Sequence, residues 1–169
     1  MSLTMYRASI PVFIRGLEVC SDLLKKGAAH AAEKGIAPAD MLSARLAPDM
    51  LPLVAQIQRA SDTAKMSAAR LSDVGAPRFE DSEDSFDALQ ERIAKTVAYL
   101  KGIDKSTLAD SDARTITLKF GDFAPSFSGV DYLLGFGLPN FYFHVVTTHD
   151  ILRHLGVAIG KRDYLGPFK

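Results

Sequence analysis

The segment SIPVFIRGLEVCSDLLKKGAAHAAEKG, residues 9–35, carries the clearest structural signal in this chain. Its apolar and small side chains recur every three or four residues, which is the repeat of a helix with one buried face. That face comprises Ile10, Phe13, Ile14, Leu17, Ser21, Leu24, Ala28 and Ala31. We expect the helix to run to Lys34 and to end at Gly35, because glycine tolerates the left-handed conformation that ends helices. Pro11 predicts either a start near Ser9 or a kink there.

Three further segments show the same repeat. The second predicted helix runs from Pro48 to Leu71, since proline suits the first helical turn. The third covers residues 86–101 and ends at a glycine, and the fourth covers 130–155. A short helical turn is expected at 38–43.

Two local features interrupt the helical pattern. Residues 115–120 alternate between apolar and polar side chains, and a Gly-Asp turn leads to a second segment, 123–128, which predicts a small β-hairpin. This hairpin lies in the long crossover between the third and fourth helices. Within the fourth helix, Pro139 must disturb the hydrogen bond to the carbonyl of Gly135, which predicts a kink.

The gross composition fits one folded domain. A content of 47% hydrophobic and 24% charged residues is typical of a globular protein, and 169 residues suit a single domain, 1–169. Sustained heptads are missing from the four helices, which argues against a coiled coil. The sequence therefore predicts an all-α four-helix bundle whose long crossover reverses the up-down alternation of the helices.

Charge and hydropathy restrict the classes of function. Twenty basic residues balance twenty acidic ones, so we expect no nucleic-acid partner. Apolar runs stay far below the roughly 18 residues of a membrane span, and Pro11 interrupts the run 8–14, so we expect neither a membrane partner nor a signal peptide. Cys20 is a single cysteine, which is typical of a reducing compartment and predicts a cytoplasmic protein. A buried cysteine behaves as a small apolar group, so thiol chemistry is not expected at this residue.

Several motifs resemble those of a known family. They are RLAPDM at 45–50, DYLL at 131–134, LPNFYFHV at 138–145, ILRHLGV at 151–157 and GKRDYLG at 160–166. Together they resemble an uncharacterised bacterial domain-of-unknown-function family within the DinB/YfiT-like superfamily of four-helix bundles. The resemblance implies the DinB-like bundle and a homodimer. It also implies a superfamily in which many members hold a divalent metal on three histidines, and some use low-molecular-weight thiols.

The histidine pattern departs from that superfamily. Its metal site needs one histidine from the second helix, and residues 48–71 contain none. The fourth helix carries His144, His149 and His154, each five residues apart, so successive side chains diverge by roughly 140° around the helix. We therefore predict no superfamily-type metal site and no cofactor, with His144 as a weak metal candidate.

The candidate ligand-binding residues are Asp49, Gln56, Tyr142 and His144. Asp49 and Gln56 are seven residues apart and would share one side of the second helix, where they could line the open end of the bundle. Alternatively, Asp49 favours the positive helix N-terminus and Gln56 is ordinary boundary polarity. His144 falls on the inner face of the fourth helix. It either satisfies nearby groups such as the hydroxyl of Thr148 or Tyr142, or it faces a ligand.

Three functions remain open from the sequence. The first is a metal-free, small-molecule-binding or otherwise non-catalytic homodimer. The second is an enzyme of the transferase or hydrolase type, dependent on a divalent metal or using a thiol, with His144 as ligand or base and Asp49 as its partner. The third is a structural or partner-binding module that uses the aromatic side chains of the fourth helix as an interface.

Overall fold

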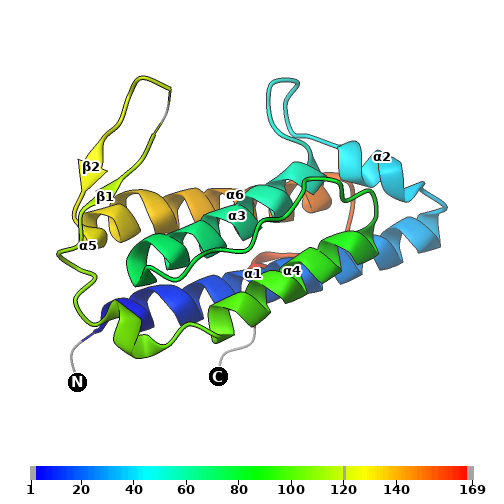
Figure 1. The fold of residues 1–169 in the computed structure, drawn as a ribbon. Coiled ribbons are helices and arrows are strands. Elements are labelled where there is room, and N and C mark those ends of the chain that lie inside the picture. Colours follow the sequence, from blue (N-terminus) through cyan, green and yellow to red (C-terminus); the bar gives the residue numbers. More distant parts are fainter. Residues whose placement is uncertain (1–2, 120, 167–169) are drawn as a thin grey trace.

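The computed structural model describes residues 3–119 and 121–166. Four long helices dominate it (Figure 1): α1 (Met5–Lys34), α3 (Leu53–Ser72), α4 (Phe86–Lys101) and α6 (Leu138–His154). Helices α1 and α3 each pack against both α4 and α6. The predicted four-helix bundle is confirmed.

The shorter elements connect these helices. They are α2 (Pro38–Ser43), η1 (Lys105–Leu108), β1 (Ile116–Thr117), β2 (Ser126–Phe127), α5 (Gly129–Tyr132), η2 (Leu133–Gly137) and α7 (Lys161–Leu165). Strands β1 and β2 pair antiparallel, with Ile116 opposite Phe127, in the long connection between α4 and the fourth bundle helix. The predicted hairpin is therefore present, with strands of two residues each; Phe120 of the predicted strand lies outside the described residues.

The connection between α3 and α4 departs from simple up-down order. Just after the end of α3, the carbonyl of Val74 accepts a hydrogen bond from Tyr99 near the end of α4. Further along, Glu83 bonds to Gln58 near the start of α3. Residues 73–85 thus run back along α3, so that α3 and α4 point in the same direction, as Figure 1 shows. The prediction that the long crossover between the third and fourth helices reverses the alternation is therefore wrong. Helix α4 ends and α5 begins at the same end of the bundle (Figure 1), so α4 and α6 run in opposite directions, and the reversal lies between α3 and α4.

Two helices begin at positions that differ from the prediction. Helix α1 begins at Met5, where the hydroxyl of Thr4 accepts a hydrogen bond from the first turn, and Pro11 lies inside it. Helix α3 begins at Leu53 instead of Pro48. The reason is the second proline, Pro52, which restricts the preceding residue to an extended conformation and so separates the turn around residues 47–50 from the helix.

The fourth bundle helix is continuous through Pro139. Elements α5, η2 and α6 follow one another without a break, and η2 is a π-helical turn in which the amide of Leu138 donates to the carbonyl of Leu133. A π turn inserts one extra residue per turn and changes the register of the hydrogen bonds. It lies immediately before the proline that cannot donate, and so takes the place of the predicted kink.

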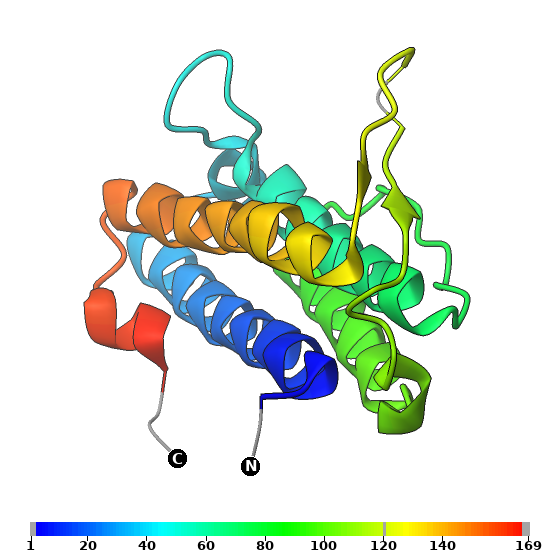
Figure 2. The same ribbon diagram turned by 90° about the vertical axis from the view of Figure 1, so that its left-hand side faces the viewer.

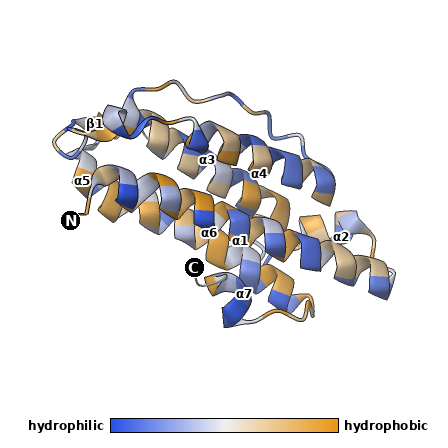
Figure 3. Cartoon of the chain, turned by 90° about the horizontal axis from the view of Figure 1, so that it is seen from below, coloured by the Kyte–Doolittle hydropathy of each residue, from blue (hydrophilic) through white to orange (hydrophobic). Residues whose placement is uncertain are grey.

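The core is closely packed where α1 meets α6. The rings of Phe13 and Phe141 pack edge to face with their centroids 5.0 Å apart. Gly16 permits this contact, because a β-carbon on it would lie 2.4 Å from the Phe141 ring. Each long helix carries both hydrophobic and hydrophilic residues (Figure 3), as expected of amphipathic helices around one core.

Helix α7, which follows α6, packs against α1. Helix α7 lies beside α1 in Figure 2, and Lys26 forms an ion pair with Asp163. Arg153 donates to the carbonyl of Ile159 at 2.7 Å. Among the described helices, none combines the length and the apolar character needed to cross a membrane.

Candidate functional site

The central polar contact between α3 and α6 joins Gln56 to His144. The His144 Nδ1 atom lies 2.8 Å from the Gln56 side-chain oxygen, and the two residues are only 8% and 1% exposed. The Gln56 amide nitrogen donates to the carbonyl of Leu51 at 2.9 Å. One carboxamide thus connects the turn before α3 to the inner face of α6.

This arrangement determines the protonation of the ring. The Gln56 nitrogen is directed to Leu51, so its oxygen faces the imidazole and can only accept a hydrogen bond. The hydrogen must then be on Nδ1 of His144, and the lone pair of the neutral ring is on Nε2.

The electrostatic surroundings favour the neutral imidazole. Burial, followed by the nearby positive charge of Arg59, lowers the pKa of His144 from 6.5 to about 4. At neutral pH the ring therefore carries no charge. It is a hydrogen-bond donor through one nitrogen and a base or acceptor through the other.

The partners of His144 differ from those considered in the sequence. The hydroxyl of Thr148 donates to the backbone carbonyl of His144 at 2.9 Å and does not bond to the ring. Tyr142 lies on another side of α6, where its ring contacts Phe141 at 5.3 Å. Burial, together with the neighbouring Tyr164, raises the pKa of Tyr142 above its ordinary value. Tyr142 therefore belongs to the contact of α6 with α1 and α7.

Asp49 is not on a helix. It is exposed in the turn that precedes α3, where the amide of Met50 bonds to the carbonyl of Ala47 at 3.0 Å. The prediction that Asp49 and Gln56 share one helical side is wrong, because Pro52 delays the start of α3. Of the four candidate residues, the structure joins Gln56 and His144 directly.

The other two histidines of α6 point away from this pair. His149 lies 2.9 Å from the carboxylate of Asp150, and its ring packs near Tyr164 on α7. His154 is exposed at the end of the helix. Within residues 3–119 and 121–166, no three side chains of histidine, cysteine, aspartate or glutamate are grouped as metal ligands. Cys20 is fully buried, and burial raises the pKa of its thiol to about 12.

A second polar cluster, centred on Arg92 of α4, was not anticipated from the sequence. The Arg92 side chain is 1% exposed and forms ion pairs with Asp62 at 2.8 Å and with Asp81 and Glu83 at 3.0 Å. Its guanidinium also lies 5.5 Å from the ring of Phe79. We call Arg92 and these three acidic residues the Arg92 cluster. A signal was present: position 92 lies on the buried side of the helix between Leu89 and Ile93, and an acidic segment precedes α4.

The Arg92 cluster holds the returning segment in place. Residues 79–83 carry two of its carboxylates and are thereby fixed to α3 and α4. Lys65 adds an ion pair to Asp62 at 3.0 Å and donates to the carbonyl of Pro77 at 3.0 Å. Every charged group of the cluster is used by another part of the same chain, which is the pattern of a structural element.

The described grooves lie away from the Gln56–His144 pair. One, of about 860 Å³, follows α1 and α4 and includes Arg15 and Gln90. Another, of about 940 Å³, lies at the start of α1 beside η1 and η2. The bundle therefore offers concave surfaces that the four candidate residues do not line.

The four-helix fold is that of a DinB-like bundle. A solved structure described as a DinB family member protein from Shewanella denitrificans is similar to it over 97% of this chain and 93% of that one, with a TM-score of 0.90 and 35% identity. Residues 5–165 match the model of the domain of unknown function DUF1993, and the chain belongs to this family. None of the curated proteins compared with the chain matches it.

Proposed function

We propose that this protein is a metal-free, non-catalytic DinB-like bundle that binds a small molecule as a homodimer. One observation carries the metal-free part of the proposal: the side chain of α3 that faces His144 is the carboxamide of Gln56, and it is bonded to the ring at 2.8 Å. A neutral amide oxygen that is committed to Nδ1–H offers a metal ion a much weaker ligand than a second imidazole.

The exposed side of α6 supports the homodimer. Phe143 is 57% exposed and Val146 is 38% exposed, and they lie three residues apart on one side of the helix. Contiguous apolar groups on the surface of a helix are the kind of surface that pairs with another protein. Replacing Phe143 by Asp is expected to reduce the mass in multi-angle light scattering from that of a dimer to that of a monomer. If the variant still has the mass of a dimer, the dimer interface lies on another face of the protein.

A second candidate function rests on the free lone pair of His144. A neutral imidazole with Nδ1–H held by a carbonyl group and a basic Nε2 is the form in which histidine serves as a general base or as a metal ligand. This favours the alternative of a metal-dependent or thiol-using transferase or hydrolase. In that case His144→Gln would abolish turnover even under conditions in which circular dichroism shows the variant to be folded.

Elemental analysis separates the two candidates. Protein purified without a chelator and without an affinity-tag metal is expected to contain well under one equivalent of zinc, nickel or manganese per chain, also after incubation with each ion. A stoichiometric metal that disappears in His144→Gln, but remains in the matched variant His154→Gln, would reject the metal-free proposal in favour of the enzyme.

A further inference from the structure

The groove at the start of α1 has a mixed lining that the Gln56–His144 pair does not explain. Its volume of about 940 Å³ is of the size that holds small organic ligands. Three large apolar side chains at its edge face water: Leu3 is 75%, Leu134 58% and Val130 38% exposed. Its lining also includes Leu133, which is fully buried.

The π turn contributes the exposed Leu134 to this apolar surface. Leu133 and Leu134 both belong to η2, where the extra residue changes the register of the helix. Exposed apolar groups are ordinary when they are scattered, but a concave group of them indicates a place that another apolar molecule covers. π turns of this kind are also frequent at functional sites.

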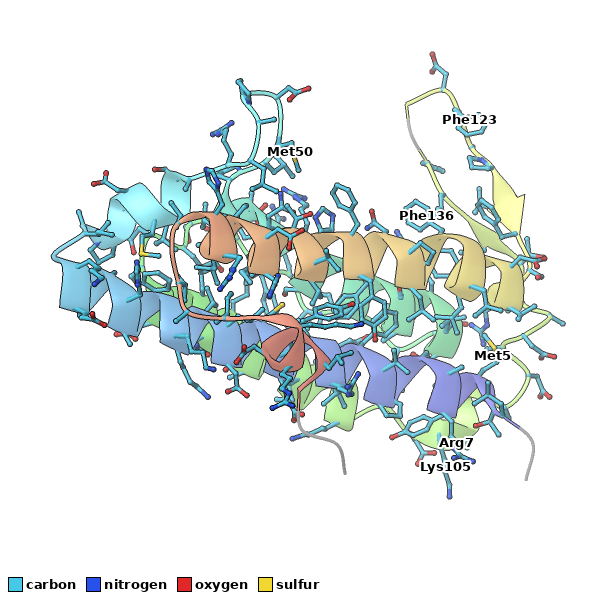
Figure 4. All side chains as sticks on the ribbon, turned by 180° about the vertical axis from the view of Figure 1, so that it is seen from behind. Met5, Arg7, Met50, Lys105, Phe123 and Phe136 are labelled. Carbon is cyan, nitrogen blue, oxygen red and sulfur yellow. The ribbon has the colours of Figure 1, made fainter. Side chains whose placement is uncertain are left out.

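Two cations belong to the same groove. Arg7 of α1 and Lys105 of η1 both line it, and Figure 4 shows their side chains close together at this end of the bundle. The Arg7 guanidinium has no ion pair or side-chain hydrogen bond to any residue in the described part of the chain. Asp112 is the acidic residue of the lining, so the groove has a net positive charge of one.

We propose that this groove binds an amphiphilic anion. Its apolar body covers Leu134 and Val130, and its carboxylate lies between Arg7 and Lys105. The inference rests on the proposed small-molecule binding and names the chemical class of the ligand. Charge complementarity selects an anion, because the lining carries a net positive charge and Arg7 has no ion pair within the described residues.

A second copy of this chain fits the groove less well. In a two-fold symmetric dimer, the same surface is present on both partners. Pairing this groove with itself would bring the Arg7 and Lys105 side chains of the two copies together, and their positive charges would repel one another. The concave shape also favours a small guest over a flat protein surface.

Isothermal titration with decanoate tests the proposal, and 1-decanol is the uncharged comparison. Wild-type protein is expected to bind decanoate with a dissociation constant below about 100 µM at physiological salt. Such a weak affinity is typical of a ligand with one charged group and a short chain. Arg7→Glu and Lys105→Glu should each weaken decanoate binding about tenfold while changing 1-decanol binding less than about twofold. The matched control is Lys119→Glu, an exposed cation near the hairpin, which should leave both affinities unchanged.

A carboxylate introduced into the apolar wall of the groove tests the proposal independently of the two cations. Leu134→Asp changes an exposed residue, so the melting temperature should be nearly unchanged, yet decanoate binding should be lost. Decanoate binding that is unaffected by Leu134→Asp and by both charge reversals would reject this groove, although small-molecule binding elsewhere would stand. Absence of decanoate binding to the wild type up to 1 mM would reject the ligand class itself. Self-association that Leu134→Asp abolishes, without decanoate binding, would assign the groove to a second copy.

Discussion

The two sides of α3 bury polar groups in opposite ways. Towards α6, Gln56 and His144 form a neutral pair in which each hydrogen bond joins uncharged atoms. Towards α4, Arg92 is surrounded by three carboxylates and is almost completely removed from water. Burying an unpaired charge is more costly than burying an unpaired neutral polar group, so less stability depends on the neutral pair than on the Arg92 cluster. The comparison indicates that the Arg92 cluster maintains the fold and that the neutral pair leaves a nitrogen lone pair available.

Removing the centre of the Arg92 cluster should have the largest effect. Arg92→Met leaves Asp62 and Glu83 without their buried partner, and we expect the free energy of unfolding to fall by about 3–5 kcal/mol. Urea unfolding measures this. Lys95→Met, on the exposed side of the same helix, is the control and should change stability by no more than about 0.5 kcal/mol. Similar losses in the two variants would refute the structural role of the cluster.

Acid should weaken the neutral pair. The pKa of His144 is about 4 when folded and near 6.5 when unfolded, so the unfolded chain binds more protons between these values. Stability from this residue is complete above pH 6.5 and is lost as the pH falls towards 4, by up to about 3 kcal/mol. The His144→Gln variant should lack this part of the pH dependence. Because Glu83 has a lowered pKa and loses its own contribution below about 4.5, the comparison is cleanest between pH 4.5 and 6.5.

Breaking the Gln56–His144 pair at neutral pH should lower the free energy of unfolding by a moderate amount. Gln56→Leu leaves His144 Nδ1–H and the carbonyl of Leu51 without a partner and should lower stability by about 1–3 kcal/mol. The double variant with His144→Phe removes both polar partners and should recover part of the loss. A double variant that is less stable than the sum of the single changes would contradict the pairing.

An exposed ion pair should contribute least. Glu91→Gln breaks the contact of Glu91 with Lys95 on the surface of α4, and the expected loss is about 0.3–0.5 kcal/mol, reduced further by salt. Chemical denaturation at 0.05 M and 0.5 M salt measures it. A larger loss would mean that charge on the surface of α4 matters as much as charge in the Arg92 cluster.

The bundle was predictable because its signals are local. The repeat of apolar residues and the stop at Gly35 require no knowledge of distant contacts, and both were confirmed. The start of α3 was predicted wrongly, because two prolines compete for the first turn and the sequence does not show which one wins. The π turn before Pro139 was also beyond local reasoning, since a proline predicts a disturbed hydrogen bond but not how the helix relieves it.

The candidate site was only partly predictable. Gln56 and His144 were selected individually from their faces, but their direct contact depends on the antiparallel packing of α3 against α6. The Arg92 cluster was missed because two of its acidic partners, Asp81 and Glu83, lie in a segment with no helical repeat. The direction in which that segment returns along α3 is set by tertiary contacts.

The tautomer of His144 tests the central claim most directly. Nitrogen-15 spectra of the imidazole, recorded at pH 7 with and without one equivalent of zinc, report which nitrogen holds the hydrogen and whether a metal binds. The account predicts a neutral ring with the hydrogen on Nδ1 and an unchanged spectrum after zinc is added. A ring protonated on both nitrogens, a hydrogen on Nε2, or a Nε2 signal shifted by stoichiometric zinc would contradict it.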